Sequence, residues 1–201
     1  MIDGKGERMM KQKNSVVQMV SVAMLSSIAY LLMMLDFPFP GLPPFLKIDF
    51  SDVPALIAAI IFSPIAGVVV EGIKNILHYG IQGSLTGVPV GEIANFIAGC
   101  LFIGPATFLF RKYRTVKSLT TGLMLGTVTM SIIMSVLNYF IILPAYTWFL
   151  NQPAMSSSGM RQIIVAAILP FNLIKGIVVT VVFVALFSRL KVWVFAKMKN
   201  A

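Results

Sequence analysis

The sequence predicts an all-α membrane protein whose six transmembrane helices form a compact bundle. Of the 201 residues, 58% are hydrophobic and 11% are charged, and the mean hydropathy is +0.90. Soluble domains have about 25% charged residues, so this chain carries more apolar surface than a soluble core can bury. The apolar residues also form long runs that end in basic clusters or proline-rich segments, a pattern typical of helices that cross a bilayer.

The candidate spans are six apolar runs. A helix needs about 20 residues to cross the hydrocarbon core, so the second run is short. It could join the third run across Ser63 and Pro64 as one kinked span, which would give five spans in total. The six runs cover residues 16–35, 53–62, 65–81, 90–110, 119–143 and 163–187.

The first run follows a basic segment, as the apolar core of a signal peptide also does. It is longer than such a core, and residues 36–41 offer no cleavage site flanked by small residues. We therefore expect an uncleaved transmembrane helix, preceded by a polar cytoplasmic leader at residues 1–13. Residues 14–193 would form a single six-helix membrane domain, and residues 194–201 a basic cytoplasmic tail.

The basic clusters decide between five and six spans. Lys and Arg gather in residues 5–13, 111–117 and 189–199, and short cytoplasmic loops carry an excess of these residues. Five spans would put the middle cluster outside, whereas six put it inside together with both termini. We expect six spans. Because the net charge of +9 resides in clusters at the ends of spans, it does not indicate nucleic-acid binding.

Six spans leave residues 36–51, 82–89 and 144–162 as external loops, and the first of these is predicted to cap the bundle. It contains four prolines and four phenylalanines. Proline lowers the entropy lost on ordering, and the aromatic side chains and Leu46 need apolar cover. Irregular backbone at membrane depth must be buried in protein or line a cavity, so a loop that folds inward also accommodates the short second span. The alternative is an aromatic belt at the membrane interface.

Lys175 is the first candidate binding residue, because it lies within an otherwise apolar run. An ionisable group near the bilayer centre costs at least about 2.5 kcal/mol, so it normally faces protein, a water-filled cavity or a ligand. Asn172, three residues earlier, shares its helix face. Pro170 should free backbone carbonyls one turn before it, close to Asn172. The sequence alone does not establish that a second ionisable group lies beside Lys175. We therefore interpret Lys175 as a hydrogen-bond donor and not as a proton or ion relay.

Asn138 is expected to join Asn172 and Lys175 in the outer half or the middle of the bundle. Carboxamides both donate and accept hydrogen bonds, whereas lysine only donates. The three side chains therefore suit a neutral heterocycle with carbonyl and amide edges. The alternative is hydrogen bonding between helices, worth about 0.6 kcal/mol per contact, which accounts for the asparagines but poorly for Lys175.

Other polar residues lie within the apolar runs. Glu71 and Lys74 are three residues apart on one helix, so we expect them to neutralise each other. Glu92 and Asn95 have the same spacing near the outer end of the fourth span, where they either line a site or bridge helices. His78 is the only histidine, and we interpret it as structural.

Several kinds of site are absent from the sequence. It has no GxxxxGK[ST] phosphate loop, and neither HExxH nor an aspartate-rich motif, so we expect no catalytic residues, no metal site and no enzyme. The one cysteine, Cys100, excludes an internal disulfide. No inverted repeat of a secondary transporter is visible. A substrate-binding membrane subunit that takes its energy from partners fits better, and the small residues Ala23 and Ser27 would let a partner helix approach the first span.

Six segments together resemble the riboflavin-specific substrate-binding (S) component of bacterial energy-coupling factor (ECF) transporters. The resemblance extends over residues 16–193. Its motifs are FPFPGLP at 37–43, LKIDFSDVP at 46–54, GVPVG at 87–91 with ANFIAG at 94–99, LNY at 137–139, LPAY at 143–146 and LPFNLIKG at 169–176.

The resemblance implies a six-helix protein of the bacterial cell membrane that captures riboflavin from outside as a substrate and needs no cofactor. Its partners would be a transmembrane coupling subunit and two cytoplasmic ATPases. Asn138, Asn172 and Lys175 would contact the isoalloxazine ring or the ribityl chain. Further implied contacts are Asn95, Leu46 and Lys47.

By the same resemblance, Ala23 and Ser27 would form the small-residue docking motif of the first helix. Serine replaces the more usual alanine at position 27, but its hydroxyl can bond to its own helix. Two other functions stay open: binding of another vitamin such as thiamine or biotin, and a structural role in a membrane complex.

Overall fold

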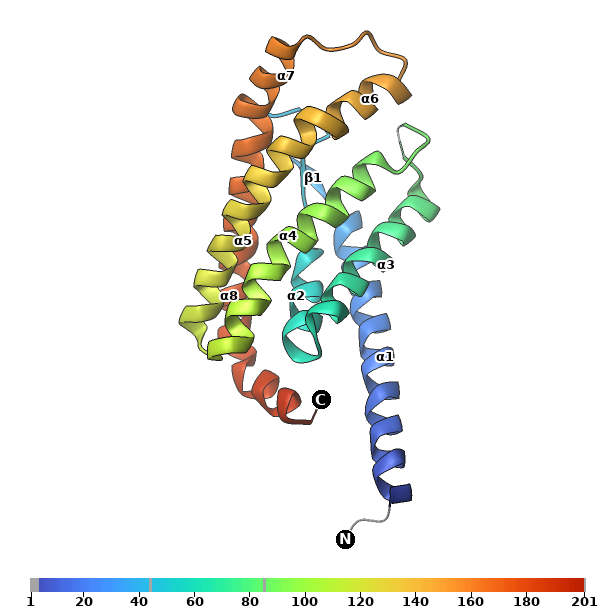
Figure 1. The fold of residues 1–201 in the computed structure, drawn as a ribbon, viewed down its shortest axis with the longest axis vertical. Helices are drawn as coiled ribbons and strands as arrows, with labels where there is room; N and C mark the ends of the chain where they lie inside the picture. Colours follow the sequence, from blue (N-terminus) through green and yellow to red (C-terminus); the bar gives the residue numbers. More distant parts are fainter. Residues whose placement is uncertain (1–3, 44, 85, 201) are drawn as a thin grey trace.

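The computed structural model describes residues 4–43, 45–84 and 86–200, which form a bundle of helices (Figure 1). The α-helices are α1 (Gly4–Met34), α2 (Asp52–Ile61), α3 (Pro64–Gln82), α4 (Val90–Tyr113), α5 (Val116–Leu137), α6 (Leu143–Phe149), α7 (Ser157–Ile163) and α8 (Leu169–Asn200). Two π-helical segments, η1 (Asn138–Ile142) and η2 (Ile164–Ile168), join α5 to α6 and α7 to α8. Strands β1 (Phe37–Pro38) and β2 (Lys47–Ile48) pair antiparallel within the first loop.

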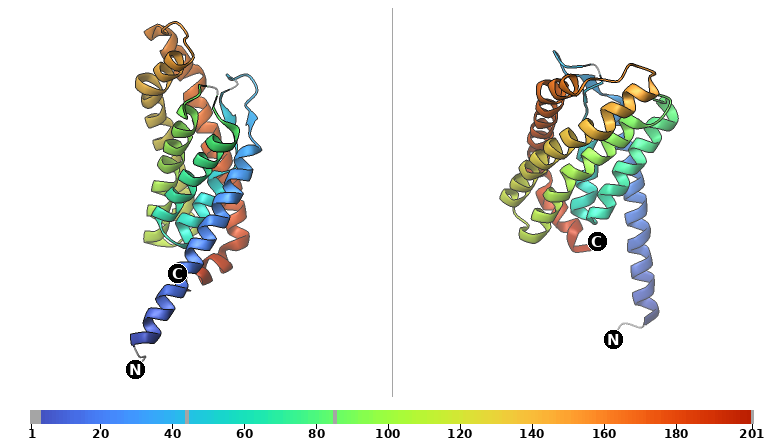
Figure 2. Two further views of the ribbon diagram at one scale, coloured as in Figure 1. Left: turned by 90° about the vertical axis from the view of Figure 1, so that its right-hand side faces the viewer. Right: turned by 45° about the horizontal axis from the view of Figure 1, so that its top comes forward.

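The connections fall into two groups at opposite ends of the bundle. The start of α1, the α2–α3 and α4–α5 turns and the end of α8 lie at one end (Figures 1 and 2). The β1–β2 hairpin, the α3–α4 loop and the α6–α7 connection lie at the other, which we call the loop end. The basic cluster at residues 111–117 therefore lies at the same end as the beginning of α1 and the end of α8, as the charge pattern predicted.

Four stretches of the described residues are long and apolar enough to cross a membrane: Ser15–Met34, Val90–Tyr113, Val116–Phe149 and Ser157–Ala196. Large apolar side chains on these stretches are exposed, among them Leu31, Phe108 and Val181. Apolar surface of this extent on the outside of a bundle is stable against lipid and not against water. The chain is therefore an integral membrane protein.

The second and third apolar runs form separate helices, so the alternative of one kinked span is wrong. Ser63 has an extended backbone, and its hydroxyl accepts a hydrogen bond from the backbone N–H of Ala66 at 3.1 Å. Pro64 follows at the first turn of α3, where its missing N–H costs nothing. A serine cap followed by proline starts a new helix, and the chain turns back at this point.

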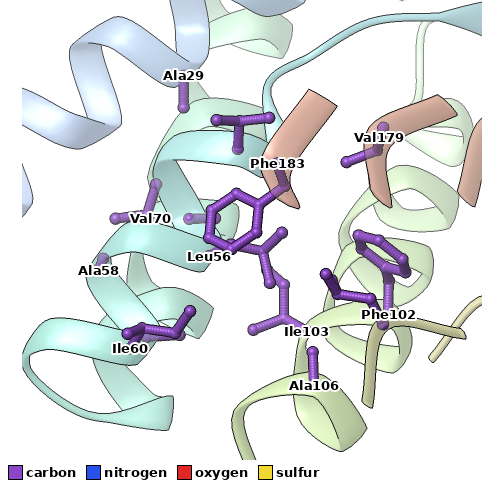
Figure 3. Packing of buried hydrophobic residues seen from close by; sticks show 14 of the residues in the cluster. Ala29, Leu56, Ala58, Ile60, Val70, Phe102, Ile103, Ala106, Val179 and Phe183 are labelled. Atoms are coloured by element: carbon purple, nitrogen blue, oxygen red, sulfur yellow. The ribbon is translucent and has the colours of Figure 1, made fainter. Parts of the chain in front are cut away.

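The short helix α2 lies inside the bundle, where nearly all of its side chains are buried. A helix that is apolar on every side needs protein cover all round. Figure 3 shows this packing: Leu56 and Ile60 of α2 lie among side chains of α1, α3, α4 and α8. Ten residues are enough for α2 because it is surrounded by protein and not by lipid.

Both π-helical segments lie next to a Leu-Pro pair. Pro144 is the second residue of α6 and Pro170 the second residue of α8. Proline removes one backbone donor and its ring clashes with the carbonyl four residues earlier, which here belongs to η1 and η2 respectively. The wider π turn relieves this clash. It also rotates the side chains on one flank of the segment relative to those on the other flank. The two predicted ligand contacts, Asn138 and Asn172, lie in or near these π-helical segments.

Glycines let α4 and α5 approach closely. A Cβ on Gly126 would collide with the backbone carbonyl of Phe102, and a Cβ on Gly122 would lie 2.8 Å from the Cα of Ala106. Small residues allow helix backbones to meet in membranes, where packing stabilises association. Gly104, also on α4, has nothing within 4 Å of the same position.

We expect Gly126→Ala to lower the free energy of unfolding by about 1–3 kcal/mol, because the new methyl group has no space beside the Phe102 carbonyl. Gly104→Ala is the matched control, since it adds the same group in open space and removes a flexible residue from a helix. Unfolding in detergent by titration with sodium dodecyl sulfate would measure both. Equal stability of the two variants would contradict this view of the α4–α5 contact.

Candidate functional site

A cavity of about 210 Å³ lies at the loop end of the bundle. All six predicted ligand contacts lie in its wall: Leu46, Lys47, Asn95, Asn138, Asn172 and Lys175. The wall is completed by Met33, Asp36, Phe45, Asp49, His78, Gly91, Glu92, Ala94, Ala98, Met134, Ile142, Tyr146, Ile168 and Phe171. The first loop and most of the helices thus contribute to one polar site at one end of the molecule.

Asn138 and Asn172 are positioned by the π-helical segments. The side-chain amide of Asn138 donates to the carbonyl of Met134 at 2.8 Å, and that of Asn172 donates to the carbonyl of Ile168 at 2.8 Å. Each bond reaches back one turn of the same helix, as side chains that bond to the i−4 carbonyl do. The carboxamide oxygen of each residue remains as an acceptor beside the cavity. Both side chains are buried.

Lys175 has two carboxylate neighbours, which the sequence alone did not establish. Its ammonium Nζ donates to Asp49 Oδ2 at 3.1 Å and lies 3.7 Å from Asp52 Oδ2. Lys175 is only 5% exposed. A buried lysine with such partners is a fixed cation, which agrees with its interpretation as a donor.

The ion pairs of Lys175 were not predicted because both partners lie far from it in the sequence. Asp49, for example, is 126 residues away. A signal was nevertheless present in the motif at residues 46–54, where two acids precede an apolar helix. An acid at that position in a membrane protein needs a cation nearby.

Lys74 forms the second half of this cluster. Its Nζ lies 2.7 Å from Glu71 Oε2, 2.7 Å from Asp52 Oδ1 and 2.6 Å from the hydroxyl of Ser51. The predicted neutralisation of Glu71 by Lys74 is confirmed, but Lys74 also binds α2 through Asp52. Lys74 and Glu71 are fully buried. We call Asp49, Asp52, Glu71, Lys74 and Lys175 the charge cluster.

Glu92 and Asn95 line the cavity and also bridge helices, so both predicted alternatives apply. Glu92 Oε1 lies 3.1 Å from His78 Nδ1, and Asn95 Oδ1 accepts from the amide of Asn75 at 3.4 Å. These contacts connect α3 with α4. His78 was interpreted only as structural, yet its side chain also lies in the cavity wall. Its spacing from Lys74, four residues along α3, places it on the same helix face.

The first loop forms part of the cavity wall through residues 45–49. Leu46 and Ile48 are buried in an apolar cluster with Leu143, Ile168 and Phe171. Lys47 also lines the cavity, with 49% of its side chain exposed, and binds Asp36 of the same loop at 2.9 Å. The loop is therefore held to the bundle by apolar contacts to α6, η2 and α8 and by the ion pair of Asp49 with Lys175, while the pair of Lys47 with Asp36 stays within the loop.

Ala23 and Ser27 lie on the exposed side of α1, away from the cavity. The Ser27 hydroxyl donates to the carbonyl of Ala23 at 3.0 Å, as expected for serine in a membrane helix. Ala23 lines a groove between α1 and α3 together with Met19, Val22 and Ile73. No group of three metal-binding side chains was found among the described residues.

An all-helical membrane protein with a polar cavity enclosed by a loop is a membrane-embedded ligand-binding protein. Such a cavity is lined by a few placed polar groups on an apolar frame, as small-molecule sites are.

The chain belongs to the family of substrate-specific components of ECF transporters, whose model matches residues 17–187. The prediction that it is not an enzyme is confirmed by this membership. It is 62% identical over 179 residues to riboflavin transporter FmnP of Bacillus subtilis strain 168, covering 89% of this chain and 94% of the relative. It is 44% identical over 173 residues to riboflavin transporter RibU of Staphylococcus aureus strain TCH60, covering 86% and 89%.

A solved structure described as the S component of a bacterial ECF transporter has the same fold. Its TM-score is 0.76 at 43% sequence identity, and the match covers 89% of this chain and 98% of that chain.

We expect Lys74→Met to reduce the free energy of unfolding by about 3–5 kcal/mol, because it leaves the carboxylates of Asp52 and Glu71 buried without their shared cation. Lys191→Met is the control, since Lys191 is an exposed lysine on α8. Detergent unfolding measured by tryptophan fluorescence gives both values.

Neutralising the two acids in the same chain, as Lys74→Met with Asp52→Asn and Glu71→Gln, should restore part of the loss. The assignment fails if Lys74→Met is as stable as Lys191→Met.

Proposed function

We propose that this chain is the riboflavin-binding subunit of an ECF-type uptake transporter in a bacterial cell membrane. The observation that carries the proposal is the convergence of three buried polar side chains, Asn138, Asn172 and Lys175, on one cavity. The names of the relatives at 62% and 44% identity, both riboflavin transporters, support riboflavin over thiamine or biotin.

The chemistry of the cavity suits this ligand. The isoalloxazine ring has a neutral edge on which two carbonyl oxygens flank one N–H. Lys175 can donate to a carbonyl, and a carboxamide oxygen of Asn138 or Asn172 can accept from the N–H. Leu46 and Phe171 offer apolar surface for the flat ring, while Lys47 and Asn95 offer polar contacts for the ribityl hydroxyls.

The proposed topology has six membrane crossings with both termini in the cytoplasm, so that the loop end faces outside. Residues 1–13 would be the cytoplasmic leader, residues 14–193 the membrane domain and residues 194–201 the basic tail. The basic cluster at residues 111–117 at the opposite end supports this orientation. Riboflavin would enter from outside and the first loop would close over it.

Release into the cytoplasm would depend on partners. A transmembrane coupling subunit would dock on α1 at Ala23 and Ser27, whose small side chains admit a neighbouring helix. Two cytoplasmic ATPases would supply the energy for a rearrangement that opens the site to the inside. This chain would supply specificity, with riboflavin as its substrate and no cofactor.

Quenching of riboflavin fluorescence by the purified protein tests the site. We expect Lys175→Met and Asn172→Ala each to raise Kd by at least about tenfold, since each leaves a buried polar edge of the ligand unpaired, at a cost of about 1–3 kcal/mol. Ser188→Ala, an exposed change on α8, should keep the parent Kd. Undiminished affinity in both site variants would refute the proposed contacts.

A competition experiment tests whether the site prefers riboflavin to other vitamins. A hundredfold excess of thiamine or biotin should leave the riboflavin signal unchanged, and protein purified from cells grown with riboflavin should be yellow. Displacement by either competitor, or colourless protein that does not bind riboflavin, would favour another substrate or a structural role.

A further inference from the structure

Besides its apolar contacts, the first loop is connected to α8 by a buried ion pair between Asp49 and Lys175. Asp49 follows β2 directly and is 3% exposed. Its Oδ2 accepts from Lys175 Nζ at 3.1 Å. Its other oxygen, Oδ1, accepts from the backbone N–H of Ser51 at 2.8 Å and also from the Ser51 hydroxyl. The carboxylate is therefore held in one orientation, with Oδ2 directed at Lys175.

Lys175 has donors for both the loop and the cavity. An ammonium carries three N–H groups. One is directed at Asp49, and Asp52 at 3.7 Å attracts a second. Since Lys175 also lines the cavity, a third can reach a bound molecule. The direction of that third donor depends on where the carboxylates hold the other two.

Asp52 would keep Lys175 charged and buried even if the loop moved away, because it belongs to α2 and is held there by Lys74. Asp49 differs from Asp52 because it lies on the loop itself, outside any helix or strand. An opening that carried Asp49 away with the loop would break its contacts with Lys175 and Ser51 but leave Asp52–Lys74 intact. The other ion pair of the loop, Lys47 with Asp36, stays within the loop and cannot fasten it to α8.

We propose that Asp49 is a positioning residue whose ion pair with Lys175 holds the first loop closed, and we call this ion pair the latch. Closing the loop would then also orient the ammonium group of Lys175 toward the ligand. This proposal rests on the proposed function, because it assigns Lys175 to the ligand. Asp49 and Lys175 are only 3% and 5% exposed, so the ion pair between them is largely desolvated. An ion pair that is desolvated in this way slows dissociation more than it speeds association.

The loop position can be measured in ligand-free protein by electron–electron double resonance between two spin labels. The labels would replace Phe37 on β1 and Gln162 on α7, both exposed, in a Cys100→Ala background. We expect one narrow distance distribution in this background and a broader or longer one in Asp49→Asn. Asp36→Asn, the matched control, breaks an ion pair inside the same loop and should leave the distribution unchanged.

A double-mutant cycle keeps the test valid if a single variant does not fold. Asp49→Asn with Lys175→Gln removes both charges of the pair, which is tolerated better than leaving one unpaired. Its loop distribution should be as broad as that of Asp49→Asn. A narrow distribution in either variant overturns the latch.

Riboflavin dissociation, followed by fluorescence recovery on dilution, is the second readout. Asp49→Asn should raise the dissociation rate constant at least about tenfold and change the association rate constant less than about threefold. Equal changes in both, or none, would overturn the positioning role. If the parent protein does not bind riboflavin, the proposed function fails while the spin-label result still decides whether Asp49 holds the loop.

Discussion

The buried charge cluster is the constraint on which the rest of the structure depends. Its two lysines and three carboxylates lie where apolar surroundings make an unpaired charge very costly. Meeting that requirement brings together the first loop, α2, α3 and α8 through contacts of 2.7 to 3.7 Å. It also explains why α2 is short and central, because Asp52 must begin the helix at the depth of Lys74 and Lys175. The cavity lies directly beside this fixed framework.

The polar side chains of the site could be predicted from the sequence because burying them in a membrane costs free energy. Lys175, Asn138 and Asn172 were recognisable because polar groups in apolar runs need a partner, and all three line the cavity. The separate helices α2 and α3 followed from the charge balance of the loops. In contrast, the partners of Lys175 were missed because pairing across 126 residues is set by tertiary packing. The π-helical segments were not predicted either, although Pro144 directly follows one apolar run and Pro170 lies inside another, and proline indicates an irregular helix.

The fold separates two tasks between two regions. At the loop end, the donors and acceptors of the cavity wall would give selectivity in the proposed function, and the first loop would close over the ligand. Along α1, exposed small residues and a groove beside α3 form the surface proposed for a coupling subunit. A shared apolar core, to which α2, α4 and α8 all contribute, packs the bundle together (Figure 3). In the proposed function, this chain would hold its substrate without a source of energy and would depend on its partners for release.

The most direct test of the central claim is a structure of the protein with riboflavin bound. Our account predicts that the polar edge of the isoalloxazine ring lies within hydrogen-bonding distance of Lys175 Nζ and of at least one of Asn138 and Asn172, while Asp49 keeps its contact with the same lysine. Riboflavin bound elsewhere, or in this cavity with Lys175 turned away from it, would contradict the account.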